Sequence, residues 1–205
     1  MDAFWYRNIY YNSVNVYYIG QNGTLLTWKE GFRYQLQSAN YSFSYEPLPG
    51  SWSVELDMEN LESNRGKVLY EDADGCRIVV SEVNKKAPYQ YRVFFRTYGV
   101  CDREGGTLVS GRVEARALST SFIGNDWPTV TAKAGDLERP CPSAGFSGLN
   151  WKDGNQFGFH LSISDDRNER AFSTAYLEAQ EGPVVVTITN LTRLRTERLW
   201  YWSLY

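Results

Sequence analysis

The sequence has little of what most catalytic and metal sites require. It holds a single histidine, His160, and three cysteines in 205 residues. Because His160 lies in an alternating stretch, we expect it on the polar face of a strand, with no second histidine to complete a dyad or a metal site. Phosphate loops, dinucleotide fingerprints and the Gly-Xaa-Ser-Xaa-Gly elbow are also missing from the sequence. We therefore expect no cofactor and no enzyme.

Long apolar runs and a strong charge imbalance are missing as well. No run approaches the roughly 20 apolar residues of a membrane helix, and the N-terminus does not resemble a signal peptide. The formal net charge is −3, whereas phosphate binding needs a basic face. The sequence therefore predicts no membrane insertion and no nucleic acid as a partner.

The three cysteines are too few and too scattered for a disulfide scaffold or a zinc site. Small buried hydrophobic residues are one interpretation, and one pair with one free thiol is another. They stand in this order: Cys76, Cys101 and Cys141.

Aromatic residues are abundant, at 16% with 15 Tyr and 7 Trp, which predicts a packed core rather than disorder. Their spacing alternates with polar residues, as in strands with one face on a core and one in water. The predicted strands cover 10–19, 24–28, 41–45, 52–58, 90–100, 156–163, 171–178 and 183–189, and 90–100 is one of three alternating runs between 64 and 115. A Gly-Gln-Asn-Gly turn at 20–23 predicts that the first two form a hairpin. Only 171–180 is a candidate for a short helix.

These runs predict an all-β chain, an antiparallel sandwich of jelly-roll type with a smaller loop-rich cap subdomain. We expect one β domain over 1–205 and a strand that stops at the Pro-Leu-Pro-Gly stretch at 47–50. Residues 121–155 are rich in Gly, Pro, Ser, Asp and Asn, which predicts a loop-rich insertion or cap.

Paired carboxylates raise the possibility of a glycosidase, whose acid and nucleophile lie about 5–9 Å apart. The candidate pairs are Glu55 with Asp57 and Asp165 with Asp166. Since the first pair fits any solvated strand face and the second a turn, we favour a protein that is not an enzyme. Calcium binding by Glu71, Asp72 and Asp74 and glycosylation at Asn22, Asn40 and Asn190 are weaker hypotheses than an acidic turn and chance matches.

Two aromatic clusters leave alternatives open. The N-terminal cluster suits either stacking on sugars or contact with another protein, and the sequence does not separate the two. Its members are Trp5, Tyr6, Tyr10 and Tyr11. Near the C-terminus, arginines alternate with aromatics, as in proteins that stack on single-stranded nucleic acid. A final strand over 199–204 packed on both faces explains that pattern equally, and the acidic total favours the strand.

Five short signatures follow one another between 49 and 115: Pro49-Gly50-Ser51-Trp52-Ser53-Val54, Asn64-Arg65-Gly66, Ala73-Asp74-Gly75-Cys76-Arg77-Ile78, Cys101-Asp102-Arg103-Glu104-Gly105 and Val113-Glu114-Ala115. This ordered set resembles the N-terminal folded part of the readthrough domain of the luteovirus, polerovirus and enamovirus minor capsid protein. The resemblance covers about a third of the chain. The polerovirus Cys-Xaa-Phe-Arg-Glu-Gly motif lacks its aromatic residue here.

The resemblance implies a virion-surface domain joined covalently through a linker to the viral coat protein. Such a domain acts in aphid transmission through receptor proteins of the vector, with a role in phloem movement, and forms a homodimer. Assembly would take place in the host plant cell cytoplasm, where thiols mostly stay reduced. The alternative is another viral spike or a carbohydrate-binding β-sandwich module.

The signature residues are expected to be structural, and no receptor-binding residue is named. They are Trp52, Asp74, Gly75, Cys76, Cys101, Arg103, Glu104 and Gly105. Trp52 is expected to anchor the core, and residues 103–105 to form a turn with an internal ion pair. A Cys76–Cys101 pair is a hypothesis for particles outside the cell.

Overall fold

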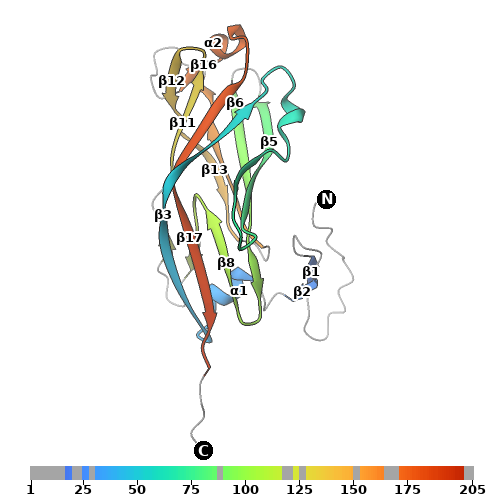
Figure 1. Cartoon of the computed structure of the whole chain (residues 1–205), viewed down its shortest axis with the longest axis vertical. Helices are drawn as coiled ribbons and strands as arrows, with labels where there is room; N and C mark the ends of the chain where they lie inside the picture. The colour runs from blue at the N-terminus through green and yellow to red at the C-terminus, as the bar shows by residue number, and fades with distance from the viewer. Residues whose placement is uncertain are drawn as a thin grey trace, which may run out of the picture.

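The computed structural model describes residues 31–86, 90–113, 128–149, 153–163 and 171–200, and the backbone alone of 17–19, 25–27, 114–116 and 122–124. Two antiparallel sheets pack in a sandwich-like arrangement (Figure 1), which confirms the predicted all-β class. Within the described chain, no helix is long and apolar enough to cross a membrane.

The first sheet has six strands, in the order β12-β11-β17-β8-β7 with β3 on the other side of β17. Their bounds are β3 Tyr41–Leu56, β7 Val100–Asp102, β8 Gly105–Ser110, β11 Thr129–Ala134, β12 Leu137–Pro140 and β17 Val184–Arg198. The second sheet has five strands in the order β13-β14-β6-β5-β4. Their bounds are β4 Val68–Glu71, β5 Arg77–Lys86, β6 Gln90–Tyr98, β13 Ser143–Ser147 and β14 Gln156–His160.

Three small strand pairs and three short helices complete the described chain. The pairs are β1 (Tyr17–Ile19) with β2 (Leu25–Thr27), β9 (Glu114–Arg116) with β10 (Phe122–Gly124), and β15 (Ser162–Ile163) with β16 (Phe172–Ser173). The antiparallel pairing of β1 with β2 confirms the predicted N-terminal hairpin. The helices are α1 (Phe32–Gln37), the 3₁₀ turn η2 (Leu61–Asn64) and α2 (Thr174–Ala179).

β3 and β17 form a long two-stranded ribbon, and its two faces pack against two different hydrophobic cores. In the first half of β17, Val184, Val186 and Ile188 face the main core between the sheets. At Asn190 the chain takes a φ of 61° and the register with β3 shifts. Asn190 stands opposite two residues of β3, Pro49 and Gly50, and the side chains that follow Asn190 in β17 point to the other face. Leu194 therefore packs into a second core with Phe32 and other side chains around α1.

Two expectations about β3 and α1 were wrong. The strand at 41–45 does not stop at the Pro-Leu-Pro-Gly stretch, since β3 runs through it to Leu56. Proline is tolerated there because β3 lies at an edge of its sheet, where a missing N–H breaks no ladder bond. Helix α1 was not predicted, because a six-residue helix depends on tertiary contacts more than on its own propensity. Its buried Gln35 donates from Nε2 to the carbonyl oxygen of Asp102 at 2.6 Å and accepts from the Thr196 hydroxyl.

The stretch 121–155 is also different from the predicted loop-rich insertion. Its described part contains β11 and β12 in the first sheet and β13 in the second. The Gly, Pro and Ser residues that suggested loops form the turns between these short strands. Farther on, the strand predicted at 171–178 was wrong beyond the two residues of β16, because α2 follows directly, within the stretch named as a candidate for a short helix.

Candidate functional site

Trp52 lies where the sequence places it, on the core side of β3. Its ring meets that of Tyr70 edge to face, with 5.6 Å between the centroids. The indole packs against the main core but remains partly exposed. Trp52 therefore covers the edge of the main core and does not lie at its centre.

The turn between β4 and β5 is built around the carboxylate of Asp72. Its Oδ1 accepts from the backbone N–H of Cys76 at 3.0 Å. Its Oδ2 accepts from the Tyr70 hydroxyl at 2.8 Å and from Nη2 of Arg193 at 2.9 Å. Burial on its own would raise the pKa of the Asp72 carboxyl, but these hydrogen bonds and the charge of Arg193 lower the pKa below its ordinary value. Arg193 belongs to β17, so this network links the two sheets.

The hypothesis of calcium binding at this turn gains no support from the geometry. The oxygens of Asp72 are already engaged, whereas Glu71 and Asp74 are exposed. No group of three or more His, Cys, Asp or Glu side chains suited to a metal occurs in the described residues. Gly75 has a φ of +87°, a conformation that glycine adopts readily, which explains its place in the turn.

All three cysteines are free, buried thiols. Cys76 belongs to the main core and donates from Sγ to the carbonyl oxygen of Thr107 at 3.3 Å, while Cys101 belongs to the second core. The hypothetical Cys76–Cys101 pair is therefore not formed in this structure. Burial raises the pKa of Cys76 to about 11 and that of Cys141 to about 12, so both are poor nucleophiles.

The turn between β7 and β8 has the predicted ion pair, with Arg103 Nε 2.8 Å from Glu104 Oε1. Its backbone also supports the end of β17, since Arg198 donates its N–H to the Glu104 carbonyl oxygen at 2.8 Å. Gly105 has a φ of +145°, and a Cβ there would overlap the carbonyl of Thr196. Only glycine fits at this close approach of two backbones.

The first cysteine-containing signature lies against the β7–β8 hairpin, whose turn carries the second. A Cβ on Gly75 would lie 3.1 Å from Cγ2 of Val100, directly before Cys101. The bond from Cys76 to Thr107 joins the first signature to β8, which follows the second. The β4–β5 turn therefore packs against a hairpin whose contacting residues are 25 or more positions away in the sequence.

Of the carboxylates considered for catalysis, one holds a turn by hydrogen bonds, one is exposed on a strand, and two lie outside the described residues. Asp57 Oδ1 accepts from the backbone N–H groups of Glu59 and Asn60 at 2.9 and 2.8 Å, and these bonds lower the pKa of Asp57. A carboxylate held in this way is a poor proton donor. Glu55 is exposed on β3. Asp165 and Asp166 lie outside the described residues.

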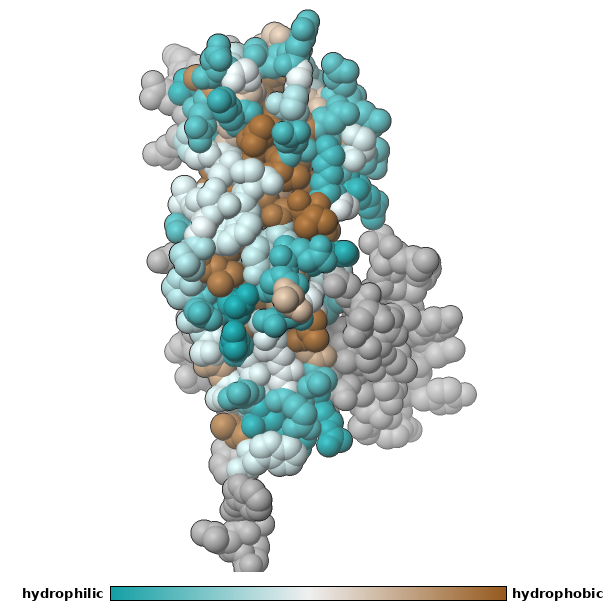
Figure 2. All heavy atoms as spheres, viewed as in Figure 1, coloured by the Kyte–Doolittle hydropathy of each residue, from teal (hydrophilic) through white to brown (hydrophobic). Residues whose placement is uncertain are grey.

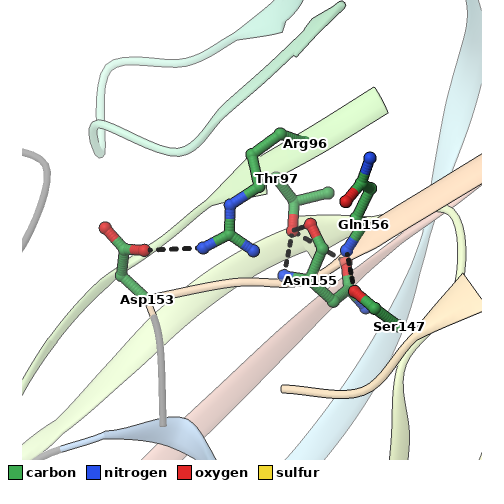
Figure 3. Close-up of polar contacts among 6 residues, drawn as sticks. All are labelled: Arg96, Thr97, Ser147, Asp153, Asn155 and Gln156. Atoms are coloured by element: carbon green, nitrogen blue, oxygen red, sulfur yellow. Dashed lines mark hydrogen bonds and ion pairs between the residues drawn. The ribbon is translucent and has the colours of Figure 1, made fainter. Parts of the chain in front are cut away.

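A buried polar cluster, shown in Figure 3, was not found from the sequence. Asn155 is fully buried, and its Oδ1 accepts from the hydroxyls of Thr97, drawn in Figure 3, and of Ser110, which the figure omits, both at 2.8 Å. Its Nδ2 donates to the Arg112 carbonyl oxygen. These contacts join β6, β8 and the start of β14. The sequence carries no signal for them, because the partners come from distant strands.

An ion pair lies beside this cluster. Arg96 Nη2 is 3.2 Å from Asp153 Oδ1, and the two side chains are 15% and 9% exposed. Figure 3 shows Asp153 and Arg96 facing each other next to Asn155. The cluster and the ion pair fix the register of neighbouring strands rather than forming an open site.

His160 is on β14, as the alternating pattern predicts. Burial and the nearby positive charge of Arg92 lower its pKa, so the imidazole is neutral near neutral pH.

The N-terminal aromatic cluster and Asn22 lie outside the described residues. At the other end, β17 stops at Arg198, so the strand predicted over 199–204 was wrong at its first two positions. There the exposed Trp200 stacks with Arg198, 4.7 Å from the guanidinium carbon to the ring centroid.

The chain was compared with family models, curated proteins and solved structures, and none of them matches it.

Proposed function

We propose that this chain is the folded part of a viral readthrough domain, displayed on a capsid as a recognition module without enzymatic activity. One observation carries the proposal. Gly75 and Cys76 of the first cysteine-containing signature contact Val100 and Thr107, the two residues of the β7–β8 hairpin that flank the second signature. Scattered chance matches have no reason to meet in the fold.

The roles of the other signature residues support the same proposal. Trp52 packs against Tyr70, and Asn64 is fully buried with its side chain bonded to backbone groups. Each signature thus specifies a turn or a packing contact of one sandwich. The contacts of a receptor would lie elsewhere on the surface, as expected for signatures that define a fold and not a binding site.

In this proposal the coat protein is the covalent partner, a second copy completes a dimer, and vector proteins are the receptors. An immunoblot of purified virions tests it, with one antibody against this chain and one against the coat protein. The proposal expects one polypeptide, larger than the coat protein, that both antibodies detect. Detection of this chain only as a separate protein would contradict it.

The recognition role has a test of its own. Fluorescently labelled chain is applied to dissected aphid gut, with the unlabelled chain as competitor and a heat-denatured sample as control. Saturable binding that only the native chain displaces is expected. Binding to a glycan panel with quenching of tryptophan fluorescence, and none to gut, would favour the carbohydrate-binding alternative.

A further inference from the structure

Among the strands that the structure describes, β3 pairs with β17 alone, from Tyr41 to Leu56, and its other edge is free of them. At its start the N–H of Leu199 reaches the carbonyl of Asn40, which shows that even-numbered residues of β3 point their backbone groups toward β17. The odd-numbered residues therefore direct their N–H and C=O groups to the free edge. Such an edge is a template for another strand.

The far end of this edge is closed by side chains. Lys67 donates from Nζ to the carbonyl oxygen of Glu55 at 2.8 Å. Asn64 accepts from the N–H of Asp57 at 2.7 Å and donates to its carbonyl at 2.6 Å. These two residues occupy the positions that a neighbouring strand would take.

The remaining edge is interrupted by proline. Pro47 and Pro49 are odd-numbered and have no N–H, and the N–H of Tyr41 is bonded to the carbonyl of Ser38 at 3.2 Å. Within the described chain, the outward N–H groups without a partner belong to Phe43, Tyr45, Ser51, Ser53 and Glu55, the last beside the carbonyl that Lys67 occupies. The edge therefore has two short windows, one on each side of the prolines.

Side chains distinguish the two windows. At the first window, the rings of Phe43 and Tyr45 meet edge to face at 5.8 Å and are partly exposed on one side of the sheet. On the other side the exposed Ser44 is paired with Arg195, which is also exposed and forms no ion pair with the residues that the structure describes. Two exposed carboxylates, Glu46 on β3 and Glu197 on β17, lie two residues from this pair on the same face. The second window offers serine hydroxyls on its outer face. In Figure 2 the middle of the side on which β3 lies is mainly pale, which marks intermediate hydropathy.

We propose that the first window, residues 43–45, binds an extended peptide segment of a partner protein, which adds a strand to the sheet. The segment places apolar residues beside Phe43 and Tyr45 and a single acidic residue beside Ser44, because Arg195 is the cross-strand neighbour of Ser44 whereas Glu46 would repel a second acid. Strands are about 4.8 Å apart, so an acidic residue there lies about 10 Å from the Arg195 backbone, within reach of its long side chain across the small serine. This inference does not depend on the viral assignment.

Residue-resolved amide exchange with peptide titration tests the inference on the whole chain. The probes are acetyl-Thr-Val-Asp-Val-Thr-amide, the same peptide with lysine in place of aspartate, and the aspartate peptide with N-methyl groups on alternate residues. In the free chain, the amides of Phe43 and Tyr45 should exchange much faster than that of Ser44. The aspartate peptide should slow the two fast amides and bind at least tenfold tighter than the other two peptides.

Matched variants locate the site. Ser44→Glu places a negative charge beside Arg195 and should weaken binding of the aspartate peptide at least tenfold. Ser53→Glu, an exposed serine in the second window, should leave binding unchanged, and both variants should keep the wild-type melting temperature. Equal loss in both variants, or no binding of any peptide, would overturn the proposal. Protection of Phe43 and Tyr45 that rises with protein concentration alone would also overturn it, because a second copy would then occupy the edge.

Discussion

The ion pair between Asp72 and Arg193 gives the most informative test of how the two sheets are held together. Asp72 follows β4 in the second sheet and Arg193 lies on β17 in the first, 2.9 Å apart between oxygen and nitrogen. The side chains are 15% and 17% exposed. The Tyr70 hydroxyl bonds to both partners, and its pKa rises to about 12 through burial and the bond to Asp72.

Removal of one partner leaves the other charge largely buried and unpaired. For fully buried pairs this costs about 3–5 kcal/mol, and we expect about 2–3 kcal/mol for Asp72→Asn because some exposure remains. Arg193→Met should cost about 1–2 kcal/mol, since the carboxylate keeps its bonds to Tyr70 and to the backbone. The double variant should be less destabilised than the sum, by about 1–2 kcal/mol.

Urea unfolding of the wild type and the three variants measures these differences. The pKa of Asp72 is lowered by folding, so its contribution is present above the ordinary value of 3.8 and is lost as the pH falls through the folded pKa. The difference in unfolding free energy between the wild type and Asp72→Asn should therefore be largest near neutral pH and should become smaller below pH 3.8. If each single variant lost less than about 0.5 kcal/mol of unfolding free energy, the pair would be no stronger than an exposed surface ion pair, and the reasoning would be refuted.

Three further predictions concern the buried cluster, the β7–β8 turn and the thiols. Asn155→Ala should cost about 3 kcal/mol in urea unfolding, because several buried hydroxyl and carbonyl groups lose their partner; a cost under 1 kcal/mol would contradict the hydrogen bonding described. Gly105→Ala should lower stability by about 2 kcal/mol or more through its positive φ and the overlap with Thr196, and an unchanged melt would show that the turn relaxes. A thiol reagent should find no reactive group in the native chain and three after denaturation; fast native labelling would conflict with the raised pKa values of Cys76 and Cys141.

Local patterns in the sequence predicted the class of the fold and several of its turns. The alternation at 52–56 places Val54 and Leu56 inward, and burial confirms it. The ion pair in the turn at 103–105 also follows from adjacent residues. Such features depend on neighbours in the sequence, which a pattern records directly.

Features that depend on distant partners were missed. The prolines at 47 and 49 suggested a strand end, because only the position of β3 at a sheet edge makes them acceptable. The bulge at Asn190, which gives β17 two opposite core faces, has no pattern of its own. The Asn155 cluster likewise joins strands that the sequence keeps about 45 and 58 positions apart. Of the candidate site, the sequence therefore predicts the signature turns but not the contacts that join them.

The nucleotide sequence upstream of the codon for Met1 tests the proposed function most directly. A coat-protein reading frame with a basic arm, one in-frame stop codon and a proline-rich linker leading into this chain is the predicted result. An untranslated leader followed by a true start codon at Met1 would contradict the readthrough assignment.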